Sequence, residues 1–285
     1  MSFQMTDEEI QLFHDYIRNY AGLVFTGGQY EIFKKRIKIR MEANSFSTAK
    51  EYFNFLRFDP RKKDELRNLI DLVTVNETYF FRETMQMETF SNNLLPEIKR
   101  EKEKQGNKKL KIWSAACSSG AEPYSLAILV KESRLFDPAQ WKVEILGTDI
   151  NSEILQVARQ GQYSEPAFRA TDKKIWDKHF HTDDKKLWRV NDDIKAMVKF
   201  THLNLFNSSQ MKLMTDIDLI LCRNVFIYFD DDVKKEVVKS FYNSLNPGGS
   251  LVVSQTESLF KITTLFDMKP MGKVLLYQKP QVGAK

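Results

Sequence analysis

Residues 110–130 read LKIWSAACSSGAEPYSLAILV. The apolar run Leu110–Trp113 predicts a buried strand, and the pattern from Glu122 to Glu132 predicts a helix. The loop between them consists of small residues, which let a backbone approach a ligand closely. It contains a single glycine, Gly120, so it matches neither the GxGxxG pattern of dinucleotide-binding folds nor the GxxxxGKS/T pattern of phosphate-binding loops. We therefore expect a cofactor that lacks a pyrophosphate.

The alternation of strands and helices continues through the rest of the chain. Further strands are expected at Val143–Thr148, Asp216–Cys222 and Ser250–Ser254, and helices at Ser152–Gln160 and Asp231–Leu245. Asn246–Gly249 reads as a turn, and Lys273–Tyr277 reads as an edge strand. Such alternation predicts βαβ units and an α/β fold with a doubly wound parallel sheet.

The N-terminal part has a different pattern and predicts a small all-helical domain. Thr6 with Glu9, and Thr48 with Glu51, form capping-box patterns, in which two side chains satisfy free backbone N–H groups at the start of a helix. We place this domain at residues 1–71 and a larger domain at residues 72–285. Residues 163–198 fit neither the helical nor the strand period and are read as an insertion.

The composition is that of an ordinary globular protein, with 42% hydrophobic and 28% charged residues. The 43 basic and 38 acidic residues give a net charge of +5, which is too small to indicate nucleic-acid binding. No apolar stretch approaches the roughly 18 residues of a membrane span, so we expect a cytoplasmic protein without membrane insertion. Cys117 and Cys222 lack the spacing of zinc ligands, and no metal site is expected.

Residues that follow the predicted strands are the first candidates for a binding site, because ligands of open parallel sheets bind outside the carboxyl ends of the strands. Asp149 follows the strand Val143–Thr148, where this topology commonly holds an acid that binds ribose hydroxyls. It also precedes Asn151 and a helix, so helix capping is an equally good interpretation.

Three segments stand out together by their order and spacing. They are TVNETYFFRE at residues 74–83, IWSAACSSGAEPYS at residues 112–125 and CRNVFIYF at residues 222–229. They resemble the signature motifs of the chemotaxis glutamate O-methyltransferases, the CheR family, and the likeness extends to about Gln278. Ala121 departs from the family, which usually has a glutamate there, but the next acid, Glu122, is retained. The resemblance implies an N-terminal helical domain followed by a Rossmann-like methyltransferase domain with a small inserted β-subdomain at about 163–198.

The resemblance also implies S-adenosylmethionine as methyl donor and glutamate side chains of chemoreceptors as acceptors. It assigns catalytic roles to Arg82 and Tyr228 and cofactor binding to Asn76, Thr78, Arg82, Glu122, Asp149, Asn204, Leu205, Arg223 and Asn224. A glutamate is already ionised at neutral pH, so the reaction needs alignment and exclusion of water more than a strong base. A guanidinium can hold a carboxylate through two hydrogen bonds, which suits Arg82. For Tyr228, a structural role in its apolar run is the competing interpretation.

A basic helix is predicted around residues 31–40, with an apolar row made by Phe33, Ile37 and Met41. Arg36 and Arg40 fall between that row and the apolar Ile32 and Ile39. We expect the two arginines to bind substrate, because the family's N-terminal domain is thought to meet the acidic methylated helices of receptors. Snorkelling at the edge of the core is an equally good alternative.

Two other functions compete with a receptor methyltransferase. A nucleic-acid methyltransferase commonly carries an Asn/Asp-Pro-Pro-Tyr loop after the fourth strand, whereas this chain has Arg223–Phe226 there. A scaffold protein without activity is disfavoured by the intact Arg82, Asp149 and Asn224. We expect a monomer that binds chemoreceptor methylation helices and no nucleic acid. The loop at residues 181–188 is short and lacks glycine, which argues against tethering by a receptor's C-terminal peptide.

Overall fold

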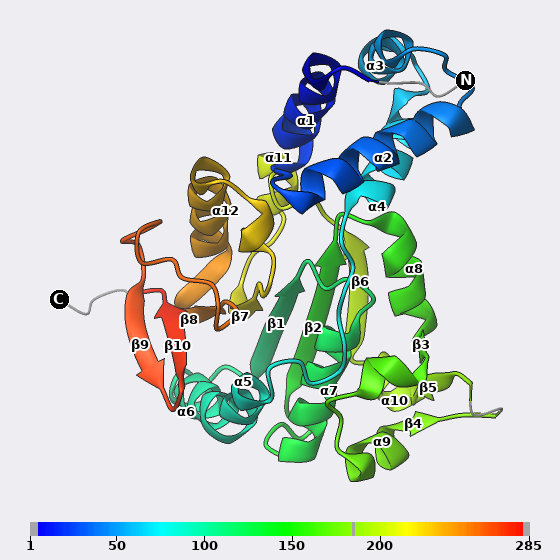
Figure 1. The fold of residues 1–285 in the computed structure, drawn as a ribbon. Coiled ribbons are helices and arrows are strands. Elements are labelled where there is room, and N and C mark those ends of the chain that lie inside the picture. The colour runs from blue at the N-terminus through cyan, green and yellow to red at the C-terminus, as the bar shows by residue number, and fades with distance from the viewer. Residues whose placement is uncertain (1–4, 184–185, 282–285) are drawn as a thin grey trace.

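A seven-stranded sheet forms the centre of the computed structural model, which describes residues 5–183 and 186–281 (Figure 1). Its order is β6-β2-β1-β7-β8-β10-β9. The first five strands of this order run parallel, and β10 runs antiparallel to both of its neighbours, β8 and β9. The strands are β1 (Lys109–Ala115), β2 (Lys142–Asp149), β6 (Val198–His202), β7 (Ile217–Leu221), β8 (Leu245–Val252), β9 (Asp267–Met271) and β10 (Val274–Gln278). The predicted doubly wound sheet is confirmed.

Helices cover both faces of the sheet, because neighbouring residues of a strand point to opposite faces. On one face Ile112 packs in a core with Leu126 of α7, and on the other Trp113 packs with Phe241 of α12. The covering helices are α5 (Thr84–Thr89), α6 (Leu95–Lys104), α7 (Ala121–Ser133), α8 (Ser152–Gln160), α11 (Ser208–Met211) and α12 (Asp231–Ser244). A π-helical turn, Phe90–Leu94, joins α5 to α6.

The inserted β-subdomain is a small antiparallel sheet of three strands with an aromatic core. Its order is β3-β5-β4, and Phe168 stacks on Phe80 and on Trp176 at 5.0 and 4.2 Å between ring centroids. Its elements are β3 (Gln162–Tyr163), a 3-10 helix (Glu165–Phe168), α9 (Lys173–His179), β4 (Phe180–His181), β5 (Trp188–Val190) and α10 (Asp192–Lys195). The loop from which we argued against tethering includes Asp184 and Lys185, which lie outside the described residues.

The N-terminal helices pack around a core of their own. They are α1 (Asp7–Ala21), α2 (Gly28–Ala43), α3 (Ala49–Phe58) and α4 (Lys62–Val73). Both predicted capping boxes are confirmed, since Thr6 and Glu9 exchange hydrogen bonds at the start of α1, and Thr48 and Glu51 do so at the start of α3. In the described part of the chain, no helix combines the length and the apolar character needed to cross a membrane.

Two details of the predicted sheet are wrong. The expected turn Asn246–Gly249 lies inside β8 as an irregularity in its pairing with β7, and the strand ends at Val252. The expected edge strand at the C-terminus, β10, has β9 on its outer side. The sequence of β9 does not indicate a strand, because it contains Pro270 and polar residues. Edge strands tolerate such residues and central strands do not.

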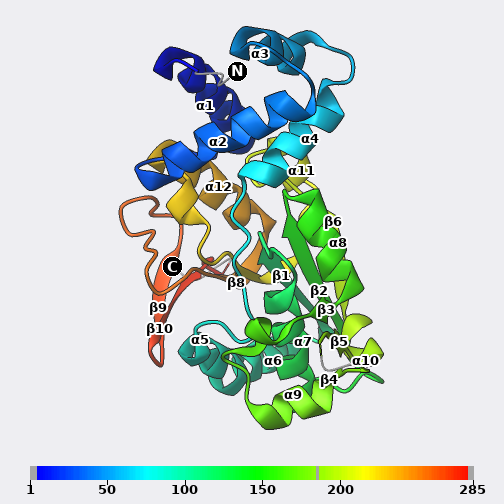
Figure 2. The same ribbon diagram turned by 45° about the vertical axis from the view of Figure 1, so that its right-hand side comes forward.

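The helical domain lies over the carboxyl ends of the parallel strands (Figures 1 and 2). Polar contacts hold it there: Arg18 Nε donates to Asp230 Oδ2 at 2.6 Å, and Asn204 Nδ2 donates to the Tyr20 carbonyl at 2.7 Å. The backbone N–H of Ser152, at the start of α8, donates to Asp71 Oδ1 at 2.7 Å. The ligand-binding end of the sheet is therefore roofed by the N-terminal helices.

Candidate functional site

A cavity of about 330 Å³ lies between this roof and the ends of β1, β2, β6 and β7. Its volume falls within the range of small-molecule sites, roughly 300–1,000 Å³. The helical domain contributes residues such as Leu23, Phe25 and Gln29, and the segment joining the two parts contributes Val73 to Tyr79 together with Phe81 and Arg82. We refer to residues 74–83 as the strap, because they run across the cavity from the roof to α5.

The structure brings nearly all the predicted site residues together. Arg36 and Tyr228 line the cavity, and so do the nine residues predicted to bind cofactor, namely Asn76, Thr78, Arg82, Glu122, Asp149, Asn204, Leu205, Arg223 and Asn224. Arg40 lines a separate surface depression beside Arg36. These residues come from segments spread along the chain from Arg36 to Tyr228, so their convergence depends on the order of the strands.

Asp149 is buried at the end of β2, with 6% of its surface exposed. Burial raises its pKa, although hydrogen bonds from the backbone N–H groups of Asn151 and Ser118, at 2.9 and 2.7 Å, oppose this effect. Asp149 does not cap α8, because the side chain of Asn151 occupies that role. Each carboxylate oxygen keeps a lone pair for a further donor.

The loop after β1 folds tightly around that carboxylate. Ala116 and Ser118 have φ angles of 56° and 52°, and Gly120 has a φ of 85°. A Cβ at Gly120 would lie 2.8 Å from the Cβ of Ala158 and 2.9 Å from the ring of Phe200, so a side chain is excluded here on both conformational and steric grounds. This glycine therefore serves close packing of the loop against α8 and β6.

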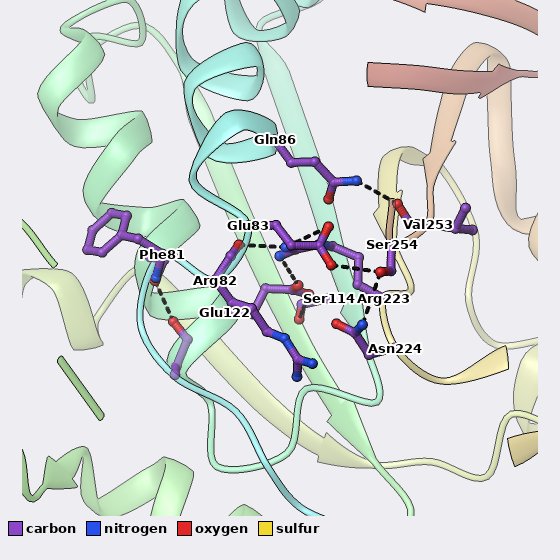
Figure 3. A network of polar contacts seen from close by, with 12 residues as sticks. Phe81, Arg82, Glu83, Gln86, Ser114, Glu122, Arg223, Asn224, Val253 and Ser254 are labelled. Carbon is purple, nitrogen blue, oxygen red and sulfur yellow. Dashed lines mark hydrogen bonds and ion pairs between the residues drawn. The ribbon is translucent and has the colours of Figure 1, made fainter. Parts of the chain in front are cut away.

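Arg223 is the centre of a polar network beneath the strap (Figure 3). Its Nη1 donates to Glu122 Oε2 at 2.8 Å, and its Nη2 donates to the backbone carbonyl of Arg82 at 2.5 Å. Nη2 also lies 3.4 Å from Glu83 Oε2, and Ser114 Oγ donates to the other oxygen of Glu122. The guanidinium thus ties β7, α7 and the strap together, with 2% of its side chain exposed.

The strap itself is anchored residue by residue. The backbone N–H of Phe80 donates to the Ala167 carbonyl at 2.9 Å, and that of Phe81 donates to Ser125 Oγ at 3.0 Å. The half-buried Arg82 side chain donates from Nη1 to the Glu77 carbonyl and lies 5.6 Å from the ring of Tyr79. The strap therefore holds the backbone of Arg82 rigidly while its guanidinium lines the cavity.

Tyr228 also lines the cavity and lies in a short 3-10 helix, Phe226–Tyr228. Its backbone carbonyl accepts a hydrogen bond from Val24 of the helical domain, at 2.9 Å. Burial raises the pKa of its hydroxyl above the usual value, so the hydroxyl stays protonated and able to donate at neutral pH.

The two arginines of α2 have different environments. Arg36 lines the cavity, donates from Nη1 to the Val73 carbonyl at 2.9 Å, and has its pKa lowered by burial. Arg40 makes a two-pronged ion pair with Glu65, at 3.0 and 2.5 Å, and Glu65 is 4% exposed. The charged end of Arg40 therefore pairs with a buried acid inside the helical domain, whereas the snorkelling alternative expects it in solvent, and of the two arginines it is Arg36 that lines the cavity.

The sequence interpretation missed several residues of the site. Glu83, Ser254 and Glu257 join the network around Asn224, although Glu83 was part of a quoted motif. Ser254 and Glu257 follow β8, so the rule that selects residues after parallel strands would have found them. The contact of Leu23 with Phe229, an isolated β-bridge, has no signal in either segment alone.

The donors and acceptors of the cavity fit S-adenosylmethionine. The Asp149 carboxylate can accept from ribose hydroxyls and Glu122 from an ammonium group, while both acids suit a cationic sulfonium. Arg223 Nε is buried without a hydrogen-bond partner within the described residues, and is thus a free donor at the site. The buried thiols of Cys117 and Cys222 have their pKa raised by burial, so they are poor nucleophiles.

Comparisons with known proteins identify the family of this chain. Residues 8–74 match the family described as CheR methyltransferase, all-alpha domain, and residues 76–275 match CheR methyltransferase, SAM binding domain. Chemotaxis protein methyltransferase 2 of Vibrio cholerae is 36% identical over 281 residues, which cover 98% of this chain and 95% of that protein. The chemotaxis protein methyltransferase of Borreliella burgdorferi is 30% identical over 259 residues, 91% of each chain. The chain belongs to the CheR family and is an S-adenosylmethionine-dependent chemotaxis methyltransferase.

Proposed function

We propose that this enzyme methylates glutamate side chains of chemoreceptors and thereby forms glutamyl methyl esters. The observation that carries the proposal is the placement of Arg82. Its backbone carbonyl is fixed by Arg223, whereas its half-buried guanidinium lines the cavity and is not paired with a carboxylate among the described residues. A guanidinium held in this way is suited to bind and align an incoming carboxylate.

The chemistry of the site agrees with a carboxylate acceptor. Bound S-adenosylmethionine supplies a methyl group on a sulfonium, which a carboxylate oxygen can take while the sulfur keeps the bonding electron pair. An ionised glutamate needs no general base, and the protonated Tyr228 does not act as one. Instead, Arg82 aligns the carboxylate, Tyr228 donates to it, and the apolar lining of the cavity excludes water.

The rim of the cavity suits an amphipathic acidic helix. Ile32 of α2 and Val75 of the strap line the cavity and are 49% and 50% exposed. Ile39 of α2 lines the neighbouring depression and is 50% exposed, and Arg36 lies between the two isoleucines along the helix. Apolar anchors around a cation match a helix that carries aliphatic residues and glutamates on one face. Relatives of this chain are named chemotaxis protein methyltransferases, which supports a chemoreceptor as the source of that helix.

The acceptor is tested by incubating the enzyme with methyl-labelled S-adenosylmethionine and a cytoplasmic chemoreceptor fragment, with DNA and RNA in parallel. We expect label on the receptor fragment, released as methanol by mild base because carboxyl esters hydrolyse readily. A fragment in which the candidate glutamates are replaced by alanine serves as control and should take up no label. Label on nucleic acid, or base-stable label on the receptor, would contradict the proposal.

The charge reversal Arg36→Glu should weaken methylation of the receptor fragment. We expect kcat/KM for the fragment to fall about 10-fold at low salt, because a rim charge steers an oppositely charged partner. The dissociation constant for S-adenosylmethionine should stay within twofold. Lys35→Glu makes the same charge change at an exposed position of α2 and should leave both quantities within twofold. Equal effects of the two substitutions would refute the role of Arg36.

Substitution Asp149→Asn should weaken binding of S-adenosylmethionine about 10- to 100-fold, because hydrogen bonds to a charged acceptor are stronger than those to a neutral one. Isothermal calorimetry with the purified protein measures this. Asp137→Asn, in an exposed loop, is the control and should have no effect. Unchanged affinity in Asp149→Asn would mean that this carboxylate serves the loop after β1 and not the cofactor.

A further inference from the structure

Ser254 occupies a position just beyond β8 from which it reaches two segments of the site. It is 2% exposed and stands outside the set of described residues that line the cavity. Its hydroxyl donates to Glu83 Oε1 on the strap at 2.7 Å and accepts from Asn224 Nδ2 after β7 at 3.0 Å (Figure 3). One hydroxyl therefore connects the residue next to Arg82 with Asn224, a cavity-lining residue of the loop after β7.

Glu257 holds the same wall through the backbone. Its Oε2 accepts from the N–H of Asn224 at 2.9 Å and from the N–H of Ser254 at 3.1 Å. Burial raises the pKa of Glu257, and these backbone hydrogen bonds oppose the rise. Asn224 is thus fixed at two points, by its amide side chain on Ser254 and by its backbone on Glu257.

The backbone at both ends of this connection is left-handed, a conformation that is rare for glutamate and less so for asparagine. Glu83 has a φ of 59° and Asn224 a φ of 60°. Such conformations persist when the surrounding structure over-determines them, and they concentrate at functional sites. Here the over-determining contacts are those to Ser254 and Glu257, together with the hydrogen bond from Gln255 N–H to Glu83 Oε2.

We propose that Glu83, Ser254 and Glu257 form a positioning network, which sets the strap residue Arg82 and the wall residue Asn224 at the distance that S-adenosylmethionine requires. Two observations carry this inference: the network joins the strap to the loop after β7 through residues that do not line the cavity, and both joined residues, Glu83 and Asn224, have left-handed backbone conformations. The three residues act through Arg82 and Asn224 and do not themselves touch the ligand. The inference depends on cofactor binding and is independent of the identity of the methyl acceptor.

Ser254→Ala tests the network in the intact protein. We expect the dissociation constant for S-adenosylmethionine, measured by calorimetry, to rise about 3- to 10-fold, the effect of losing one or two hydrogen bonds that order a binding site. Ser244→Ala is a matched control, because Ser244 is 3% exposed and its hydroxyl donates to the Ser240 carbonyl within α12, away from the cavity. The control should stay within twofold, and an equal result for both serines would overturn the proposal.

A double-substitution cycle separates positioning from a general structural effect. In an Asn224→Ala background, Ser254→Ala should weaken binding less than twofold further, because the hydrogen bond between the two side chains is already absent there. Fully additive losses would show that Ser254 acts independently of Asn224 and would contradict the inference. If Ser254→Ala does not fold, Glu83→Gln replaces it as the test, because glutamine keeps the shape of the side chain that accepts from Ser254. An unchanged dissociation constant for S-adenosylmethionine in Glu83→Gln would also contradict the inference.

Discussion

The buried guanidinium of Arg223 is the interaction on which the rest of the site depends. A charge buried to this degree is tolerable only when ion pairs and hydrogen bonds compensate for its lost hydration. Glu122 on α7 supplies one partner, and the carbonyl of Arg82 supplies another. Glu83 faces the same guanidinium; burial opposes its ionisation, but the hydrogen bond from Ser254 and the charge of Arg223 outweigh this and lower its pKa. Satisfying Arg223 therefore requires the strap to lie across the strand ends.

This requirement links the two parts of the chain. The strap continues directly from α4, so fixing the strap at Arg82 also restricts where the helical domain can lie. Contacts at Asp71, Tyr20 and Val24 then complete the roof over the strand ends. The cavity is consequently shared between both parts, and its walls come from segments that only tertiary folding brings together.

Local sequence patterns predicted the helices and strands well. Most of the contacts that they did not predict join residues far apart in the chain. The capping boxes at Thr6 and Thr48 and the small-residue loop after β1 are contained in a few adjacent residues, so the sequence displays them. The partner of Arg40 is Glu65, on another helix, and no spacing in α2 reveals whether that arginine points to solvent or to a buried acid. The roles of Ser254 and Glu257 depend on the strand order, which places the end of β8 beside that of β7.

Hydrogen exchange of the strap in Arg223→Lys is the most direct test of this account. A lysine keeps the charge but lacks the planar fork that reaches Glu122 and the Arg82 carbonyl together. We predict that the amides of Phe80 and Phe81 lose protection through local opening, while those of β1 and α1 exchange as in the wild type. Wild-type protection of the strap in this variant would contradict the claim that Arg223 holds the site together.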